Sequence, residues 1–352
     1  MTHDDVALVR GLVEIPSLSR HEGEAVEWLV GRMRERGFRA TVDDAGNAVG
    51  EIGDGPRHVV LLGHIDTVPG EIPVAIEDDE LVGRGAVDAK GPLAAFVAAA
   101  TERVPGLRVT VVGAVEEESP TSAGARHRAT LPSPDWCVIG EPSGWDGITI
   151  AYKGRLVLRV ALERSARHGA APGPTCSEEA LLVWERIRGA AFALTESKDG
   201  FERLDTRLEG MTSGGDGLRE RAELRVGFRV PPGLAIATLE DLARAAVAEH
   251  VGSRATVERV AAEEPARTSR ATPLAGAFAK AITSAGATPR FTQKSGTSDM
   301  NILAPAWGCP MVAYGPGDSA YDHTPVERLA LADYARSIVV LKDVLRRASA
   351  VP

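Results

Sequence analysis

The sequence predicts an α/β fold in which a mainly parallel sheet is sandwiched by helices, with a second, α+β domain inserted into it. Two observations support this prediction. Over the first 150 residues, strand-like and helix-like segments alternate, which is typical of a parallel sheet between helices. After Gly154, apolar and polar residues alternate regularly, as expected of an antiparallel sheet with one face in water. We therefore expect residues 1–154 and 266–352 to form one domain and residues 155–265 the other.

The first domain is expected to contain an early helix, several strands and a final helix. Residues 22–36 have helical spacing, with Ala25, Leu29 and Met33 on one face, and they end before Gly37, a residue suited to a helix C-cap. The other predicted elements are strands at residues 39–42, 58–62, 108–115 and 136–139 and a helix at residues 329–347.

The inserted domain is expected to have ferredoxin-like order. Its two clearest strands, residues 155–163 and 222–230, carry apolar side chains at their even positions. The remaining elements are helices at residues 177–188 and 239–250 and strands at residues 203–208 and 255–260. The resulting order, strand-helix-strand-strand-helix-strand, is that of a ferredoxin-like unit.

Composition limits the functional classes. A chain of 352 residues with 44% hydrophobic and 25% charged residues is typical of a globular protein with two domains. The net charge of −9 argues against nucleic acid as a partner, because phosphate binding needs a basic face. We expect no membrane association, since no apolar run is long enough to span a bilayer, and the start of the chain lacks a signal pattern. A cytoplasmic location is therefore expected, with Cys137, Cys176 and Cys309 as reduced thiols.

A candidate metal site begins at the end of the apolar run 59–62. His64 and Asp66 follow it two residues apart, so in an extended segment they face the same way, with His64 as a ligand and Asp66 holding its ring. Taken alone, such a pair is more often a turn or a satisfied polar edge. The interpretation therefore depends on whether other parts of the chain supply further ligands.

Further metal-binding side chains occur in loops or at predicted strand ends. Asp88 lies in a glycine-rich loop, and Glu116-Glu117-Glu118 follows the strand at residues 108–115. The acidic run alone would favour a solvated turn. The remaining candidates are Glu141, after the strand at residues 136–139, and His323, just before the final helix. Ligands converge at the carboxyl ends of strands in α/β sheets. Mixed nitrogen and oxygen ligands suit zinc, or cobalt and manganese as substitutes, in a pair about 3.5 Å apart.

These motifs, in this order, resemble the M20 family of co-catalytic zinc peptidases and deacylases over almost the whole chain, from Leu8 to about Leu345. The resemblance implies a zinc-peptidase-like catalytic domain, two Zn²⁺ ions per subunit, and a lid and dimerisation domain at residues 155–265. It also implies an amide hydrolase that works as a homodimer. The zinc ligands that it implies are His64, Asp88, Glu118, Glu141 and His323, with Asp88 bridging the two ions.

The resemblance also implies roles in catalysis and substrate binding. Asp66 would orient His64, and Glu117 would act as the general base. Many members have aspartate where this chain has Glu116, which leaves an uncertainty of one residue in the choice of base. His168 would reach the partner subunit's site and bind the carbonyl oxygen, although alone it would be read as a surface loop residue.

Substrate carboxylate binding is implied for Arg229, which alone would be read as a solvated charge on a strand. The backbone of Ser295, Gly296 and Thr297 would assist it. The segment 294–301, with Tyr314-Gly315-Pro316-Gly317, is similar to that of hydrolases which release lysine or ornithine from the C-terminal glutamate of an amino-group carrier protein in lysine and arginine biosynthesis.

Alternative functions remain open. They are an N-acetylornithine or N-acetyl-lysine deacetylase, a succinyl-diaminopimelate desuccinylase, and a scaffold protein without turnover. If the carrier protein is the substrate and is acidic, it needs a basic patch on this acidic chain. The candidates are Arg126, Arg128, Lys153, Arg155, Arg164 and Arg167, each of which could equally be an ordinary surface charge.

Overall fold

The computed structural model describes residues 2–350, and the chain divides into two compact units. The first unit comprises Met1–Ala151, Arg267–Gln293 and Ser298–Pro352, and the second comprises Tyr152–Ala266 and Lys294–Thr297. Each unit has its own cluster of buried apolar side chains. The segment that carries Ser295, Gly296 and Thr297 thus packs with the second unit, although it is distant from the rest of that unit in sequence.

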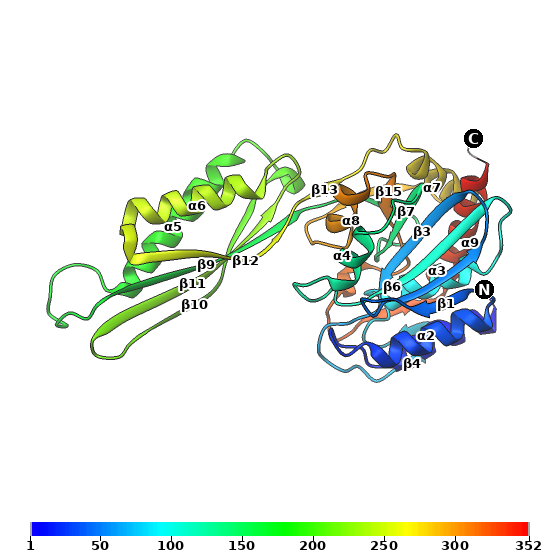
Figure 1. Ribbon diagram of the computed structural model, residues 1–352, viewed down its shortest axis with the longest axis horizontal. Coiled ribbons are helices and arrows are strands. Elements are labelled where there is room, and N and C mark those ends of the chain that lie inside the picture. The colour runs from blue at the N-terminus through cyan, green and yellow to red at the C-terminus, as the bar shows by residue number, and fades with distance from the viewer. Residues whose placement is uncertain (1, 351–352) are drawn as a thin grey trace. The chain divides into compact units, whose positions relative to one another are not determined.

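The first unit is built on a nine-stranded sheet (Figure 1). Its strand order is β1 (Arg39–Val42), β2 (Ala48–Gly53), β6 (Leu107–Ala114), β3 (Arg57–His64), β7 (Trp136–Gly140), β15 (Met311–Ala313), β8 (Gly147–Tyr152) and β13 (Ala266–Arg267), with β14 (Arg290–Lys294) paired to β8. The central strands β6, β3, β7 and β15 are parallel neighbours, and the pairs β1–β2, β2–β6 and β15–β8 are antiparallel. The mainly parallel sheet predicted from the sequence is confirmed.

Helices cover this sheet, and a small sheet lies beside it. The helices are α1 (His3–Glu14), α2 (Gly23–Glu35), α3 (Lys90–Ala100), α4 (Ala123–Ala129), α7 (Pro273–Ser284), α8 (Met300–Trp307) and α9 (Leu331–Ser349). Every residue of α3 is buried, because this alanine-rich helix packs against β3 and β6 as well as α1 and α9. The small sheet has the order β16 (Arg328–Ala330), β5 (Glu80–Val82), β4 (Ala75–Glu77).

The predicted elements of the first unit agree with the structure to within two residues at each end. The predicted early helix is α2, and the predicted strand at residues 39–42 is β1. The final helix starts two residues later than predicted because residues 328–330 form strand β16, which pairs with β5. The strand at residues 58–62 extends to His64, so the histidine is the last residue of β3.

The second unit is a four-stranded antiparallel sheet with two helices. Its strand order is β10 (Asp205–Gly215), β11 (Arg219–Val230), β9 (Gly154–Ser165) and β12 (Ala255–Glu263), and its helices are α5 (Cys176–Leu194) and α6 (Ile236–Val251). The predicted ferredoxin-like order is therefore observed. Even-numbered residues of β9 and β11, such as Leu158 and Val226, form its core with residues of α5 and α6. The odd-numbered side chains lie on the other face of the sheet.

Short 3₁₀ turns occur at Gly200–Glu202, Gly252–Arg254 and Ser319–Tyr321.

Across residues 2–350, no helix has both the length and the apolar composition that crossing a membrane would require.

Candidate active site

The candidate metal ligands of the first unit come from loops at one edge of its sheet. His64 ends β3, Glu117 and Glu118 follow β6, and Glu141 follows β7 directly. Strands β6, β3 and β7 are parallel neighbours, so their carboxyl ends meet at the same edge. Asp88 lies two residues before α3. The predicted convergence of residues from distant parts of the sequence is therefore observed.

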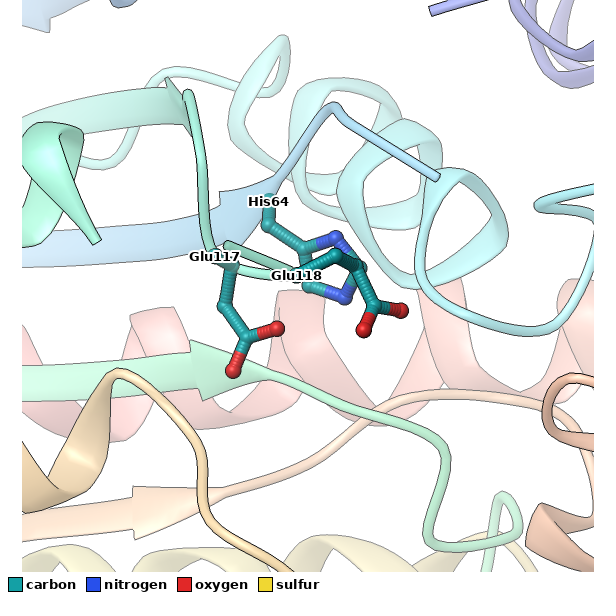
Figure 2. A group of neighbouring side chains, drawn as sticks. All are labelled: His64, Glu117 and Glu118. Carbon is teal, nitrogen blue, oxygen red and sulfur yellow. The ribbon is translucent and has the colours of Figure 1, made fainter. Parts of the chain in front are cut away.

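Two overlapping groups of potential ligands lie at this edge. Ligand atoms of His64, Glu117 and Glu118 lie within 4.8 Å of one another, and those of Asp88, Glu118 and His323 do so as well. Figure 2 shows the ring of His64 at the end of β3 beside the two glutamate side chains. Glu118 belongs to both groups, so the two groups are contiguous.

Asp88 joins the two histidines of the site. Its Oδ1 lies 3.2 Å from Nε2 of His64, and its Oδ2 lies 2.9 Å from Nε2 of His323. Burial alone would raise the pKa of Asp88, but hydrogen bonds from the two imidazoles lower it below its usual range. Two different carboxylate oxygens therefore face two different imidazoles, an arrangement that allows a carboxylate to bridge two cations.

Asp66 connects the His64 segment to the acidic loop. Nδ1 of His64 lies 3.0 Å from the backbone oxygen of Asp66 and 3.5 Å from its carboxylate. The carboxylate itself accepts hydrogen bonds from the backbone N–H groups of Glu117 and Glu118, at 3.1 and 3.0 Å, and from the hydroxyl of Ser19 at 2.6 Å. Asp66 thus fixes the backbone of both glutamates as well as the ring of His64.

The electrostatics of the site are those of crowded carboxylates. Burial raises the pKa of Glu117 well above its usual range, and the neighbouring carboxylates of Glu141 and Glu118 raise it further. Hydrogen bonds to the carboxylates of Asp88 and Glu118 raise the pKa of His323 to about 10. Neighbouring negative charge contributes to both shifts, and divalent cations would neutralise it.

The other predicted site residues lie as follows. Glu141 is buried at the end of β7 and belongs to neither of the two groups. His168 is exposed in the loop between β9 and α5 of the second unit, where its Nδ1 accepts a hydrogen bond from the backbone of Ala170 at 3.2 Å. Arg229 is in β11 of the same unit.

Lys153, a candidate for a surface basic patch, is instead buried and paired with Asp205 at 2.7 Å, so it is not a surface contact.

Two residues that the sequence analysis did not identify support the loop of Asp88. The buried carboxylate of Glu327 accepts hydrogen bonds from the backbone N–H groups of Val87 and Asp88, at 2.9 and 3.0 Å. Arg84 pairs with Glu327 at 2.9 Å and donates a hydrogen bond to the backbone oxygen of Thr324 at 3.1 Å. In the sequence, only closeness to the candidate ligands could have indicated these two residues. Arg84 lies four residues before Asp88, and Glu327 lies four residues after His323.

Comparisons with known proteins agree with this fold. Residues 60–347 match the model of peptidase family M20/M25/M40. The chain is 45% identical over 349 residues to a LysW-lysine hydrolase of Deinococcus radiodurans, covering 97% of this chain and 96% of that protein. It is 39% identical over 345 residues to a putative LysW-lysine/LysW-ornithine hydrolase of Pyrococcus abyssi, covering 98% and 94%.

Solved structures share the same fold. An M20 family metallo-carboxypeptidase from Sulfolobus solfataricus superposes with a TM-score of 0.82 at 17% identity, covering 99% of this chain and all of that one. A Bacillus subtilis protein described as a dinuclear metal binding peptidase of the M20 family gives a TM-score of 0.71 at 15% identity, covering 97% of each chain. With a family match over most of its length, the chain belongs to peptidase family M20/M25/M40.

Proposed function

We propose that this protein is a metal-dependent amide hydrolase that releases lysine, ornithine or both from the C-terminal glutamate of an amino-group carrier protein. The observation that carries the chemistry is the position of Asp88, whose two carboxylate oxygens face His64 and His323. The substrate is proposed because relatives that match along almost the whole chain, one of them 45% identical, are named for this reaction.

The donor set fits a pair of divalent cations. Two imidazoles and three carboxylates give the mixed nitrogen and oxygen ligands that zinc accepts, with cobalt or manganese as possible substitutes. The ligands proposed for one ion are His64, Asp88 and Glu141, and those for the other are Asp88, Glu118 and His323. Bound cations would supply Lewis acidity towards the amide carbonyl and towards the attacking water.

The protein's own groups would transfer protons and hold the substrate. Glu117 would take the proton of the attacking water and pass it to the departing amine. Asp66 would keep Glu117 in position through the hydrogen bond that it accepts from the Glu117 backbone. His168, acting in the partner subunit of a cytoplasmic homodimer formed through residues 155–265, would stabilise negative charge on the carbonyl oxygen. Arg229 would bind a substrate carboxylate, assisted by the backbone of residues 295–297.

The test compares substrates on one preparation of enzyme. Purified protein loaded with zinc is given the carrier protein bearing lysine on its terminal glutamate and, separately, N-acetyl-lysine, N-acetylornithine and succinyl-diaminopimelate. Released amino acid is quantified by mass spectrometry, with a chelator-treated sample as the control. We expect kcat/KM to be highest for the loaded carrier. A higher value for any of the small substrates would reject the carrier as the natural substrate.

A further inference from the structure

The open face of the second unit's sheet carries an unusual number of arginines. Helices α5 and α6 cover one face of this sheet, and the odd-numbered side chains of β9 and β11 lie on the other. Residue Arg207 of β10 pairs with Gly227 of β11 and therefore belongs to the same open face. The arginines of this face are Arg155, Arg159, Arg207, Arg219, Arg221, Arg225 and Arg229.

Away from one end of the sheet, these arginines are paired with glutamates on neighbouring strands. Arg159 lies 2.7 Å from both Glu223 and Glu258, on the strands to either side. Arg225 lies 2.9 Å from Glu209. Such cross-strand pairs neutralise each other, so this part of the face has no need of a ligand.

The end of the sheet at which β9 begins is different. Asp205, Arg229, Arg155 and Glu263 lie opposite one another in a single row across the four strands. Arg229 and Arg155 are therefore direct neighbours on adjacent strands, where like charges repel. Arg225 and Arg159 are neighbours in the same way, but each of them has a glutamate partner. The carboxylate of Asp205 cannot fully neutralise the two arginines, because it is already paired with Lys153 at 2.7 Å.

A third arginine, Arg207, lies one row further along the sheet. Within residues 2–350, neither Arg207 nor Arg155 nor Arg229 forms an ion pair with a carboxylate. Nη1 of Arg229 is buried and makes no hydrogen bond. Burial, and then the positive charges of Arg155 and Arg207, lower the pKa of Arg229. Glu209 and Glu263 attract Arg229 only at longer range.

We propose that Arg155, Arg207 and Arg229 form a binding site for a ligand that carries two carboxylates. A guanidinium group binds carboxylates through a fork of N–H donors, and the three groups here offer more donors than one carboxylate can accept. Arg155 and Arg229 come from strands about 4.8 Å apart, and Arg207 comes from the next row, so the donors are spread over more than the width of one carboxylate. Binding would also supply a partner for the buried Nη1 of Arg229.

This site deepens the proposed function and rests on it for the identity of the ligand. An amide between a C-terminal glutamate and lysine keeps two free carboxylates, one on the glutamate and one on the lysine, whichever glutamate carboxyl is used. N-acetyl-lysine and N-acetylornithine keep only one. A site for two carboxylates therefore favours a glutamyl amide over an acetylated amino acid.

The first experiment measures binding of simple probes to the metal-loaded enzyme by calorimetry. Glutarate carries two carboxylates and pentanoate, of similar length, carries one. We expect Arg155→Gln and Arg207→Gln to weaken glutarate binding roughly tenfold or more, as expected for loss of a charged hydrogen-bonding partner. Arg159→Gln is the matched control, because Arg159 lies on the same strand and face but is paired. It should bind glutarate as the wild type does.

The second experiment measures KM for the lysine-loaded carrier and for N-acetyl-lysine. We expect Arg155→Gln and Arg207→Gln to raise KM for the loaded carrier about tenfold. KM for N-acetyl-lysine, which keeps only one of the two carboxylates, should rise less, and the melting temperature should stay close to that of the wild type. Unchanged glutarate binding in both variants would overturn the site, as would an equal loss of pentanoate binding. If the enzyme does not cleave the carrier but glutarate binding still depends on Arg155 and Arg207, the proposed function fails while the site stands.

Discussion

Arg84 and Glu327, which are 243 residues apart in the sequence, form an ion pair in which Nη1 lies 2.9 Å from Oε2. The other oxygen of Glu327 accepts the backbone N–H groups of Val87 and Asp88. The pair therefore links the loop that carries Asp88 to the segment that follows His323. Since both histidines of the site face Asp88, the position of this loop controls how well both cations would be held.

Removing the carboxylate of Glu327 should weaken metal binding. We expect Glu327→Ala to lower the metal affinity roughly ten- to a hundredfold, because the backbone of Asp88 loses its acceptor. Glu327→Gln keeps one oxygen for the backbone N–H groups and should lower the metal affinity less. Metal content after dialysis against a competing chelator measures the effect. Glu80→Gln is the control, because Glu80 pairs with Arg328 at 3.5 Å on the surface and should retain normal metal content. Full retention of metal by Glu327→Ala would contradict this role.

The identity of the general base can be tested by changing each glutamate of the acidic run. Glu117→Gln should reduce kcat by about two to four orders of magnitude, because the amide cannot accept the water proton, while bound metal stays the same. Glu116→Gln should leave kcat within about threefold, because the Glu116 side chain is hydrogen-bonded to Thr121 outside both ligand groups. Steady-state kinetics and metal analysis are measured on the same samples. A large loss of kcat in Glu116→Gln and none in Glu117→Gln would identify Glu116 as the general base.

The sequence indicated where the candidate ligands lie in the fold better than it indicated the contacts that hold them. The apolar run before His64 marks a buried strand, and a polar residue at its end must lie at the edge of the sheet. No comparable pattern shows that the carboxylate of Asp66 accepts the backbone N–H groups of Glu117 and Glu118, because that contact exists only once β3 and β6 pair. Glu327 was missed for the same reason.

Some elements were also beyond prediction from periodicity. Strands β4, β5, β15 and β16 have three residues each, which is too short for an alternating pattern to be recognised. Helix α8 contains Pro305, a residue that normally argues against a helix interior. These short elements are stabilised by tertiary contacts, such as the parallel pairing of β15 with β7.

Asp66→Asn tests whether the acidic loop is positioned by this carboxylate. The backbone N–H groups of Glu117 and Glu118 donate to different oxygens of the Asp66 carboxylate, and asparagine replaces one of these oxygens with an NH₂ group that cannot accept. We expect kcat to fall at least about tenfold and the metal affinity to weaken. Ser19→Ala removes only the hydroxyl that donates to Asp66 and should have a smaller effect. Equal kinetics for Asp66→Asn and the wild type would show that the acidic loop keeps its position without the Asp66 carboxylate.

His58 should make the folded state less stable in mild acid. At the start of β3, its Nε2 lies 2.9 Å from the hydroxyl of Thr110, and burial together with Arg108 lowers the pKa of His58 from 6.5 to about 4. Between these two values the unfolded chain takes up a proton that the folded chain does not, so stability is present above pH 6.5 and falls as the pH drops towards 4. At pH 5 this linkage amounts to about 2 kcal/mol.

The change that tests this linkage is His58→Gln, which cannot titrate. Urea unfolding at pH 7 and pH 5, with a chelator present to remove the contribution of bound metal, gives the loss of stability in acid. We expect that loss to be smaller in His58→Gln than in the wild type by about 2 kcal/mol. His3→Gln, which changes an exposed histidine of α1, serves as the control and should lose as much stability as the wild type. If all three proteins lose the same free energy between the two pH values, the acid sensitivity does not come from His58.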